Sequence, residues 1–205
     1  EGVTKYLPGY AGFLMEKELL HLGAILDRPT HPFVAILGGK KVEDKIPVIR
    51  HLLTRADAIL LGGAMSYTFL RARGLEVGKS LVEPERVEMA KDLMERAAFR
   101  LTIPHDATVA PAIAEGKKAH AVKRDAIPAG EAMLDIGPDS AISYGRAIAA
   151  AKTIIWNGPM GVFETPPFDA GTLAVARAMA AATERGATTI IGGGDSAAAV
   201  EAAGL

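Results

Sequence analysis

Short apolar runs followed by glycine constrain the fold of this chain more than any other feature of its sequence. Runs of four or five apolar residues are typical of strands buried in a parallel sheet, and helical patterns separate these runs along the chain. Such an alternation predicts an α/β domain in three layers, a parallel sheet with helices on both faces. The runs are Phe33–Leu37, Ala58–Leu61, Met133–Ile136, Thr153–Trp156 and Thr188–Ile191.

The glycines that follow these runs predict where a ligand binds. The carboxyl ends of parallel strands meet at one edge of a sheet, and open α/β sheets bind ligands at that edge. We therefore expect Gly38–Gly39, Gly62–Gly63, Gly137, Gly158 and Gly192–Gly194 to gather there.

The remaining elements follow from helical periodicity and from proline or glycine at element ends. A further strand is expected at 100–103, and residues 115–131, rich in Lys, Ala, Pro and Gly, are expected to be the least ordered part. Helices are predicted at 11–22, 43–56, 65–73, 84–98, 109–115, 142–151 and 169–185.

The segment Thr188–Val200, TTIIGGGDSAAAV, is the clearest candidate for an anion site. It predicts a strand, a tight glycine turn and a helix whose N-cap is Asp195 or Ser196. Amides in the first turn of such a helix favour a phosphate, and the Asp195 carboxylate beside it suggests a bridging Mg²⁺. The alternative is a plain strand–turn–helix corner, in which the glycines only relieve crowding.

Composition excludes several classes of protein. The chain of 205 residues has 23 basic and 24 acidic residues, so it lacks the positive charge that nucleic-acid binding requires. It has no cysteine, which excludes disulfides and thiolate metal sites and favours an intracellular protein. Its apolar runs are shorter than the roughly 18 residues of a membrane-spanning helix. Because it does not begin with methionine, we expect it to be a fragment of a longer protein.

Lys41 and Lys45 lie four residues apart at the start of a predicted helix, beside Gly38–Gly39. At that spacing both ammonium groups project from one side, and with Lys40 they form a basic cluster that can grip a phosphate chain. The alternative is a solvated lysine face, which is common on protein surfaces.

Two further glycine-containing segments bear on the site. GLEVGKS (74–80) is one residue short of a P-loop and is preceded by a helix, so we interpret it as an ordinary loop. In WNGPMGVFE (156–164), Asn157 and Glu164 can hydrogen-bond sugar hydroxyls, or the segment is a packed connection. The histidines show no metal-ligand spacing, and no G-x-G-x-x-G motif supports a dinucleotide-dependent dehydrogenase.

The sequence resembles the C-terminal, nucleotide-binding half of the phosphoglycerate kinases. The similar segments occur in that family's order across nearly the whole chain. They are LPGYAGFLMEKEL (7–19), LGGKKVEDKI (37–46), LLGGAMSYTFL (60–70), VGKSLVE (77–83), LDIGP (134–138), WNGPMGVFE (156–164) and IIGGGDS (190–196).

The resemblance implies a Rossmann-like fold and phosphoryl transfer between 1,3-bisphosphoglycerate and MgADP, which gives 3-phosphoglycerate and MgATP. It implies that Lys41 neutralises the moving phosphoryl group, Lys45 holds nucleotide phosphates and Asp195 ligates Mg²⁺. Gly192, Gly193, Gly194 and Ser196 would donate to the phosphates. The remaining implied nucleotide contacts are Lys40, Gly63, Ala64, Leu81, Leu134, Pro159, Met160 and Val162, with Asn157 and Glu164 near the ribose.

Four departures from the family pattern stand out. Lys40 replaces the usual alanine, Met133 replaces a glycine that lets adenine lie close, and the turn at 98–101 is a few residues short. The chain also stops before the family's Thr-Gly-Gly-Gly-Ala-Ser phosphate loop. We therefore expect altered phosphate affinity and a narrower base pocket.

The resemblance also implies how the chain is organised. Residues 1–23 would form the interdomain helix region and 24–205 the nucleotide-binding domain, with the N-terminal substrate domain absent. The family is monomeric and cytoplasmic, but a half whose helix at 11–22 is uncovered is expected to dimerise. Phosphoglycerate would bind only with the missing domain, so the isolated half should be inactive or nearly so. The alternative is an engineered, ancestral or partial half-domain that keeps the fold with weak nucleotide binding.

Overall fold

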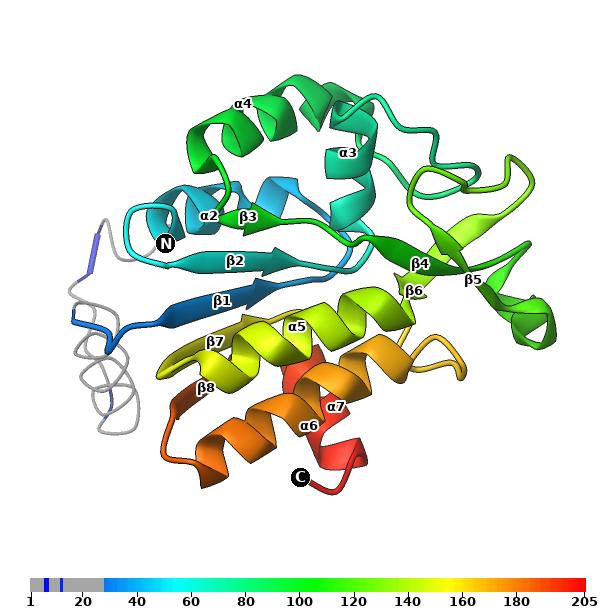
Figure 1. Ribbon diagram of the computed structural model, residues 1–205. Coiled ribbons are helices and arrows are strands. Elements are labelled where there is room, and N and C mark those ends of the chain that lie inside the picture. The colour runs from blue at the N-terminus through cyan, green and yellow to red at the C-terminus, as the bar shows by residue number, and fades with distance from the viewer. Residues whose placement is uncertain (1–5, 8–11, 13–27) are drawn as a thin grey trace. The chain divides into compact units, whose positions relative to one another are not determined.

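The computed structural model describes residues 6–7, 12 and 28–205. Its contacts divide the chain into two compact units, Glu1–Thr30 and His31–Leu205. The helix expected at 11–22 lies outside the described residues. The fold that follows is that of the second unit (Figure 1).

The second unit is built on a parallel sheet of five strands in the order β3-β2-β1-β7-β8. Phe33 pairs with Thr153, and Val34 pairs with Ala58, so β1 lies at the centre. This arrangement confirms the predicted parallel α/β sheet. The strands are β1 (Phe33–Leu37), β2 (Ala58–Leu61), β3 (Leu101–Thr102), β7 (Thr153–Asn157) and β8 (Thr188–Gly192).

Helices cover both faces of this sheet, with α2, α3 and α4 on one side and α5 and α6 on the other (Figure 1). Two of the predicted helices begin with a 3₁₀ turn before the α-helix proper, which fits prolines that lack a donor near the helix start. The helical elements are η2 (Glu43–Lys45), α2 (Ile46–Leu52), α3 (Met65–Ala72), η3 (Pro84–Arg86), α4 (Val87–Ala97), α5 (Pro138–Ala150), α6 (Ala170–Glu184) and α7 (Gly194–Ala202).

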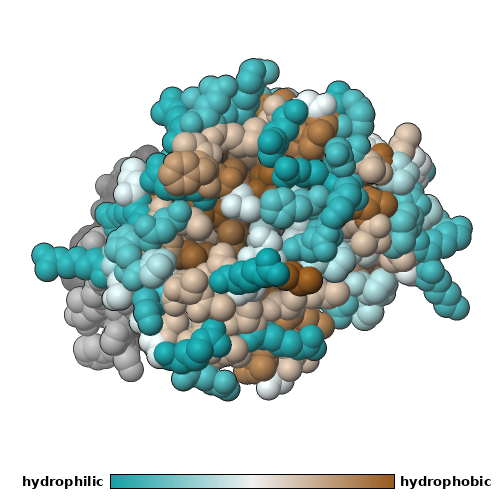
Figure 2. Space-filling model, in the orientation of Figure 1, coloured by the Kyte–Doolittle hydropathy of each residue, from teal (hydrophilic) through white to brown (hydrophobic). Residues whose placement is uncertain are grey.

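Successive side chains along each strand point to opposite faces of the sheet, so the core has one part on each face. On one face, Ile36 of β1 and Trp156 of β7 pack in one cluster with Tyr144 and Ile148 of α5 and Met179 of α6. Full burial of each large apolar side chain contributes about 1.5–3 kcal/mol. On the other side of the sheet, α2, α3 and α4 each carry fully buried apolar side chains, and hydrophilic residues cover the outer side of α4 (Figure 2). The sheet is therefore held from both sides by apolar packing.

A second sheet corrects part of the predicted pattern. It has three antiparallel strands in the order β5-β4-β6, and a 3₁₀ segment follows β4. The helix predicted at 109–115 is therefore wrong, and 133–136 is a strand outside the main sheet. Residues 115–131, expected to be the least ordered part, include a strand. The elements are β4 (Asp106–Ala110), η4 (Ile113–Lys118), β5 (His120–Lys123) and β6 (Ala132–Ile136).

Gly137 serves the junction between the second sheet and α5 rather than the edge of the main sheet. The buried Asp106 carboxylate accepts the backbone N–H groups of Asp139 (2.9 Å) and Ser140 (2.8 Å), so it caps the start of α5 from β4. A Cβ on Gly137 would lie 2.2 Å from the carboxyl carbon of Asp106. Glycine is required there for this cap, and the prediction that Gly137 joins the other glycines is wrong.

Candidate functional site

The site lies where the main sheet reverses its order of strand connection. The chain leaves β1 towards β2 on one side and leaves β7 towards β8 on the other, so the two loops diverge from neighbouring strands. Open α/β sheets form a ligand crevice at such a point, at the carboxyl ends of the strands. The predicted edge is therefore a crevice between the β1 and β7 loops.

Backbone hydrogen bonds join three of the glycine loops directly. Gly38 N–H donates to the Asn157 carbonyl (2.9 Å), and Gly39 N–H donates to the Pro159 carbonyl (2.9 Å). Gly63 N–H donates to the Met160 carbonyl (2.8 Å). The loops after β1, β2 and β7 thus form one connected floor for the crevice.

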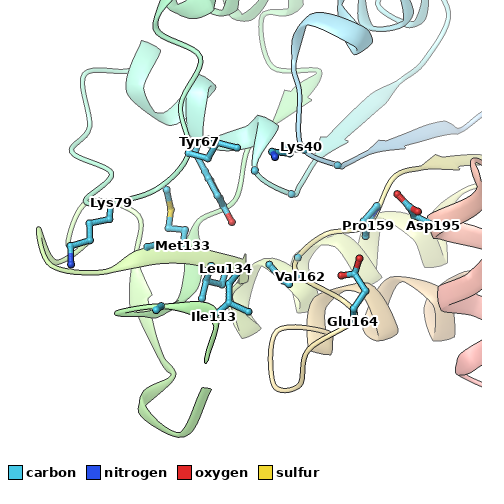
Figure 3. A pocket seen from close by; sticks show the side chains of 17 residues that line it. Lys40, Tyr67, Lys79, Ile113, Met133, Leu134, Pro159, Val162, Glu164 and Asp195 are labelled. Atoms are coloured by element: carbon cyan, nitrogen blue, oxygen red, sulfur yellow. The ribbon is translucent and has the colours of Figure 1, made fainter. Parts of the chain in front are cut away.

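Two cavities open above this floor. One, of about 430 Å³, is lined mainly by charged residues and glycines, and the other, of about 510 Å³, is lined mainly by apolar side chains. Gly39, Lys40, Pro159 and Asp195 line both, so the cavities form one continuous cleft. Figure 3 shows the apolar cavity, with Leu134, Ile113 and Val162 on one side and Asp195 at its far end.

The polar cavity is organised around Lys45. Its ammonium group donates to the Asn157 side-chain oxygen, and Lys41 and Asp195 line the same space. Partial burial lowers the pKa of Lys45, while the charges of Asp44 and Asp195 act in the opposite direction. Lys45 is therefore a half-buried cation whose ammonium group is held in place by Asn157.

The start of α7 forms the opposite wall of the polar cavity. Gly193 precedes the helix with φ +89°, a conformation that favours glycine, and Gly194 is the first helical residue. The buried Ser196 hydroxyl oxygen accepts the Gly158 N–H (2.7 Å), which fixes the β7 loop against α7. The helix thus presents free first-turn amides to the cavity, an arrangement that favours anions.

The apolar cavity lies between the two sheets. Leu134 of β6 packs with Val162, whose N–H donates to the Leu134 carbonyl (2.9 Å). Met133 also lines it, with its N–H bound by the Ser80 hydroxyl (2.9 Å), and Tyr67 enters from α3. This wall is mainly apolar, as is typical of pockets that bind aromatic ligands.

Most residues proposed from the sequence line this cleft. In the polar cavity are Lys40, Lys41, Lys45, Asn157, Pro159, Gly193, Gly194, Asp195 and Ser196. In the apolar cavity are Gly63, Ala64, Leu81, Leu134, Val162 and Glu164. Lys40, Pro159 and Asp195 belong to both.

Three residues differ from their expected places. Met160 lines neither cavity, because its side chain is fully buried beneath Gly62, with Sδ 2.4 Å from where a Cβ on that glycine would lie. Gly192 also lies outside both cavities, as the last residue of β8. Asn157, expected near a ribose, lies in the polar cavity on Lys45.

Sequence reasoning missed several lining residues of the apolar cavity. Tyr67 lies in a helix whose other residues are mostly core, and so gave no signal of its own. The others belong to the second sheet and its neighbouring loops, which were not predicted as such. They are Lys79, Ala112, Ile113 and Ala132.

A buried carboxyl lies directly behind the apolar cavity. Asp135 accepts the N–H groups of Gly171 (2.7 Å) and Ile136 (2.8 Å), and a Cβ on Gly161 would lie 2.4 Å from its Oδ1. Burial raises the pKa of Asp135 to about 8. It therefore holds a proton in the folded protein at pH values where an unfolded chain has lost it.

This carboxyl predicts how stability depends on pH. Between about pH 4, where an exposed aspartate titrates, and pH 8, the folded state binds one more proton than the unfolded state. The free energy of unfolding should thus fall as pH rises through this range and level off above it. We expect Asp135→Asn to flatten the curve in denaturant titrations from pH 5 to 9. Asp92→Asn, at a half-exposed carboxylate on α4, is the matched control, and an unchanged slope in Asp135→Asn would contradict the assignment.

The family model for phosphoglycerate kinase matches residues 1–205. The chain belongs to the phosphoglycerate kinase family. It is 54% identical over 208 residues to the phosphoglycerate kinase of Chloroflexus aurantiacus and 53% identical over 207 residues to that of a strain of Thermus thermophilus. It spans about half the length of these relatives, 52% and 53%.

Solved structures support the same family assignment. The phosphoglycerate kinase of Coxiella burnetii matches with a TM-score of 0.90 and 40% identity over 95% of this chain and 50% of its own. That of Pyrococcus horikoshii matches with a TM-score of 0.76 and 29% identity over 99% of this chain and 56% of its own. The chain therefore has the phosphoglycerate kinase fold over the part that it covers.

Proposed function

We propose that residues 24–205 are the adenine-nucleotide-binding domain of a phosphoglycerate kinase. The observation that carries this proposal is the continuous cleft, in which an apolar cavity adjoins a polar one at Gly39, Lys40, Pro159 and Asp195. A nucleotide has the same two parts, a flat apolar base and a charged phosphate chain. The similarity to phosphoglycerate kinases supports the same conclusion.

In this proposal the base lies against Leu134 and Val162, and the phosphates lie in the polar cavity. The amides of Gly193 and Gly194 and the positive end of α7 favour the phosphate charge. Lys45 holds the phosphate chain through its ammonium group. Lys41 stands exposed at the mouth of the same cavity, where it neutralises the phosphoryl group that is transferred.

The residues present fit a magnesium ion that arrives with the nucleotide. Asp44 and Asp195 both line the polar cavity, and carboxylate and phosphate oxygens are the ligands that Mg²⁺ prefers. Within residues 28–205 no group of three His, Cys, Asp or Glu side chains is placed to hold a metal. Nucleotide phosphates would therefore supply the remaining oxygen ligands, with Asp195 as the protein's ligand. When bound, Mg²⁺ neutralises phosphate charge during transfer.

The complete reaction is proposed for the whole protein. Transfer of a phosphoryl group between 1,3-bisphosphoglycerate and ADP needs a site for phosphoglycerate, which we assign to an N-terminal domain outside this chain. The isolated chain is expected to bind nucleotide but to turn over very weakly or not at all.

Among the helices of the described residues, none has the length and apolar character of a membrane span.

A second candidate is a partial half-domain that keeps the fold with weak nucleotide binding. The side chain of Met133 favours it, because it lines the apolar cavity where glycine is expected and narrows the space for a base. Affinity separates the two candidates, since a narrowed cavity weakens ADP binding without affecting a ligand that consists of phosphate alone.

Calorimetric titration with MgADP tests the proposal. We expect saturable binding to one site, weakened about tenfold by Asp195→Asn and by removal of Mg²⁺, because each removes a charged contact to the phosphates. The Mg²⁺ effect should largely disappear in the variant, since Asp195 acts through the ion. Asp92→Asn, on the exposed side of α4, is the matched control. Absence of binding by a protein with native circular dichroism would reject the proposal.

A further inference from the structure

Tyr67 places a nearly buried side chain with a hydroxyl group in the apolar cavity. It lies in the first turn of α3, it is 5% exposed, and it lines the cavity. Figure 3 shows its ring reaching from α3 into the cavity, with the hydroxyl towards the side where Leu134 and Val162 lie. The Tyr67 hydroxyl therefore lies in a cavity whose lining is otherwise mainly apolar.

The Tyr67 hydroxyl makes no hydrogen bond with the described part of the chain, whereas the fully buried Tyr144 hydroxyl donates to the Leu61 carbonyl (2.5 Å). A hydroxyl that faces a cavity without a protein partner bonds water or a ligand there, since native proteins normally satisfy such groups. The cavity of about 510 Å³ is large enough for a small ligand beside the ring. The missing partner is therefore to be sought in the cavity.

Burial raises the pKa of Tyr67 well above the ordinary value of a phenol. The phenol consequently stays neutral at any pH at which the protein is handled, so its oxygen can both donate and accept a hydrogen bond. A heteroaromatic base is the chemical class that matches this combination. It stacks on apolar walls and presents ring nitrogens that accept and exocyclic amines that donate.

We propose that the Tyr67 hydroxyl hydrogen-bonds the edge of the base of the bound nucleotide. The proposal rests on the proposed function, because it takes the apolar cavity to hold the base. It adds a specific polar contact to a pocket whose other side chains act mainly by shape. A tyrosine at this position then strengthens nucleotide binding without touching the phosphates.

The test compares two tyrosines and two ligands in the full chain. Tyr67→Phe should bind MgADP about fivefold more weakly, the effect of one neutral hydrogen bond, and magnesium pyrophosphate, which has no base, with unchanged affinity. Its resistance to urea should not fall, since no bond within the protein is lost. Tyr144→Phe should show the reverse, reduced resistance to urea with unchanged affinity for MgADP.

The outcomes separate this inference from the proposed function. Wild-type protein that binds MgADP with an affinity unchanged in Tyr67→Phe would overturn the inference alone. An equal loss for both ligands would also overturn it, since the hydroxyl would then act on the fold rather than on the base. Wild-type protein that does not bind MgADP would overturn the proposed function, and the inference with it.

Discussion

Replacing Gly38 by alanine should lower the free energy of unfolding by at least about 3 kcal/mol. A Cβ at this position would lie 2.1 Å from the Pro159 carbonyl oxygen and 2.6 Å from the Gly158 carbonyl oxygen. Both atoms belong to the backbone, and the Pro159 oxygen already accepts the Gly39 N–H. Neither can move aside without separating the β1 and β7 loops. Urea denaturation followed by circular dichroism measures the effect.

Gly145→Ala is the matched control for this substitution. Gly145 lies within α5 and has open space where a Cβ would be placed. Alanine there should raise stability by about 0.5–1 kcal/mol, since glycine is the poorer helix former. A Gly38→Ala protein as stable as the wild type would show that the two loops are not packed backbone to backbone.

Lys45→Met should weaken the binding of MgADP about thirtyfold, corresponding to about 2 kcal/mol for a lost charged contact. Methionine keeps most of the side-chain length but removes the ammonium group that bonds Asn157 and faces the polar cavity. The fold should tolerate the change, because burial already opposes the charge on Lys45. Calorimetric titration gives the affinity and urea denaturation gives the stability.

Lys91→Met controls for the general loss of a positive charge. Lys91 is exposed on α4 and lines neither cavity, so its replacement should leave MgADP affinity unchanged. Equal affinities of Lys45→Met and wild type would remove Lys45 from the phosphate site. Equal losses in the two lysine variants would instead indicate a long-range effect of net charge.

The main sheet could be predicted because its signals are local. Runs such as Phe33–Leu37 and Ala58–Leu61 are continuously apolar and end at glycines, which marks buried parallel strands and their loops. The lysines and Asp195 could be placed near one another for the same reason, since each follows a strand of that sheet. The local pattern thus predicted that the lysines and Asp195 lie near one another, and they line one cavity.

The second sheet could not be predicted because it depends on tertiary contacts rather than on local sequence patterns. β4 carries Asp106 at a buried position, which contradicts a simple strand pattern until the carboxylate is seen to cap α5. Tyr67 looks like an ordinary core residue of α3 until its hydroxyl is found without a partner among the described residues. Asn157 was assigned to a ribose from its polarity and from the family resemblance, whereas its distance to Lys45 is set by how β7 pairs with β1.

The central claim is that one cleft has separate places for a base and for phosphates. The most direct test is amide NMR of the chain titrated separately with adenosine, magnesium pyrophosphate and MgADP. We predict that adenosine shifts the amides of Leu134 and Val162, pyrophosphate shifts those of Gly193 and Gly194, and MgADP shifts both sets. Shifts confined to other parts of the chain, or the same amides shifted by adenosine and by pyrophosphate, would contradict the claim.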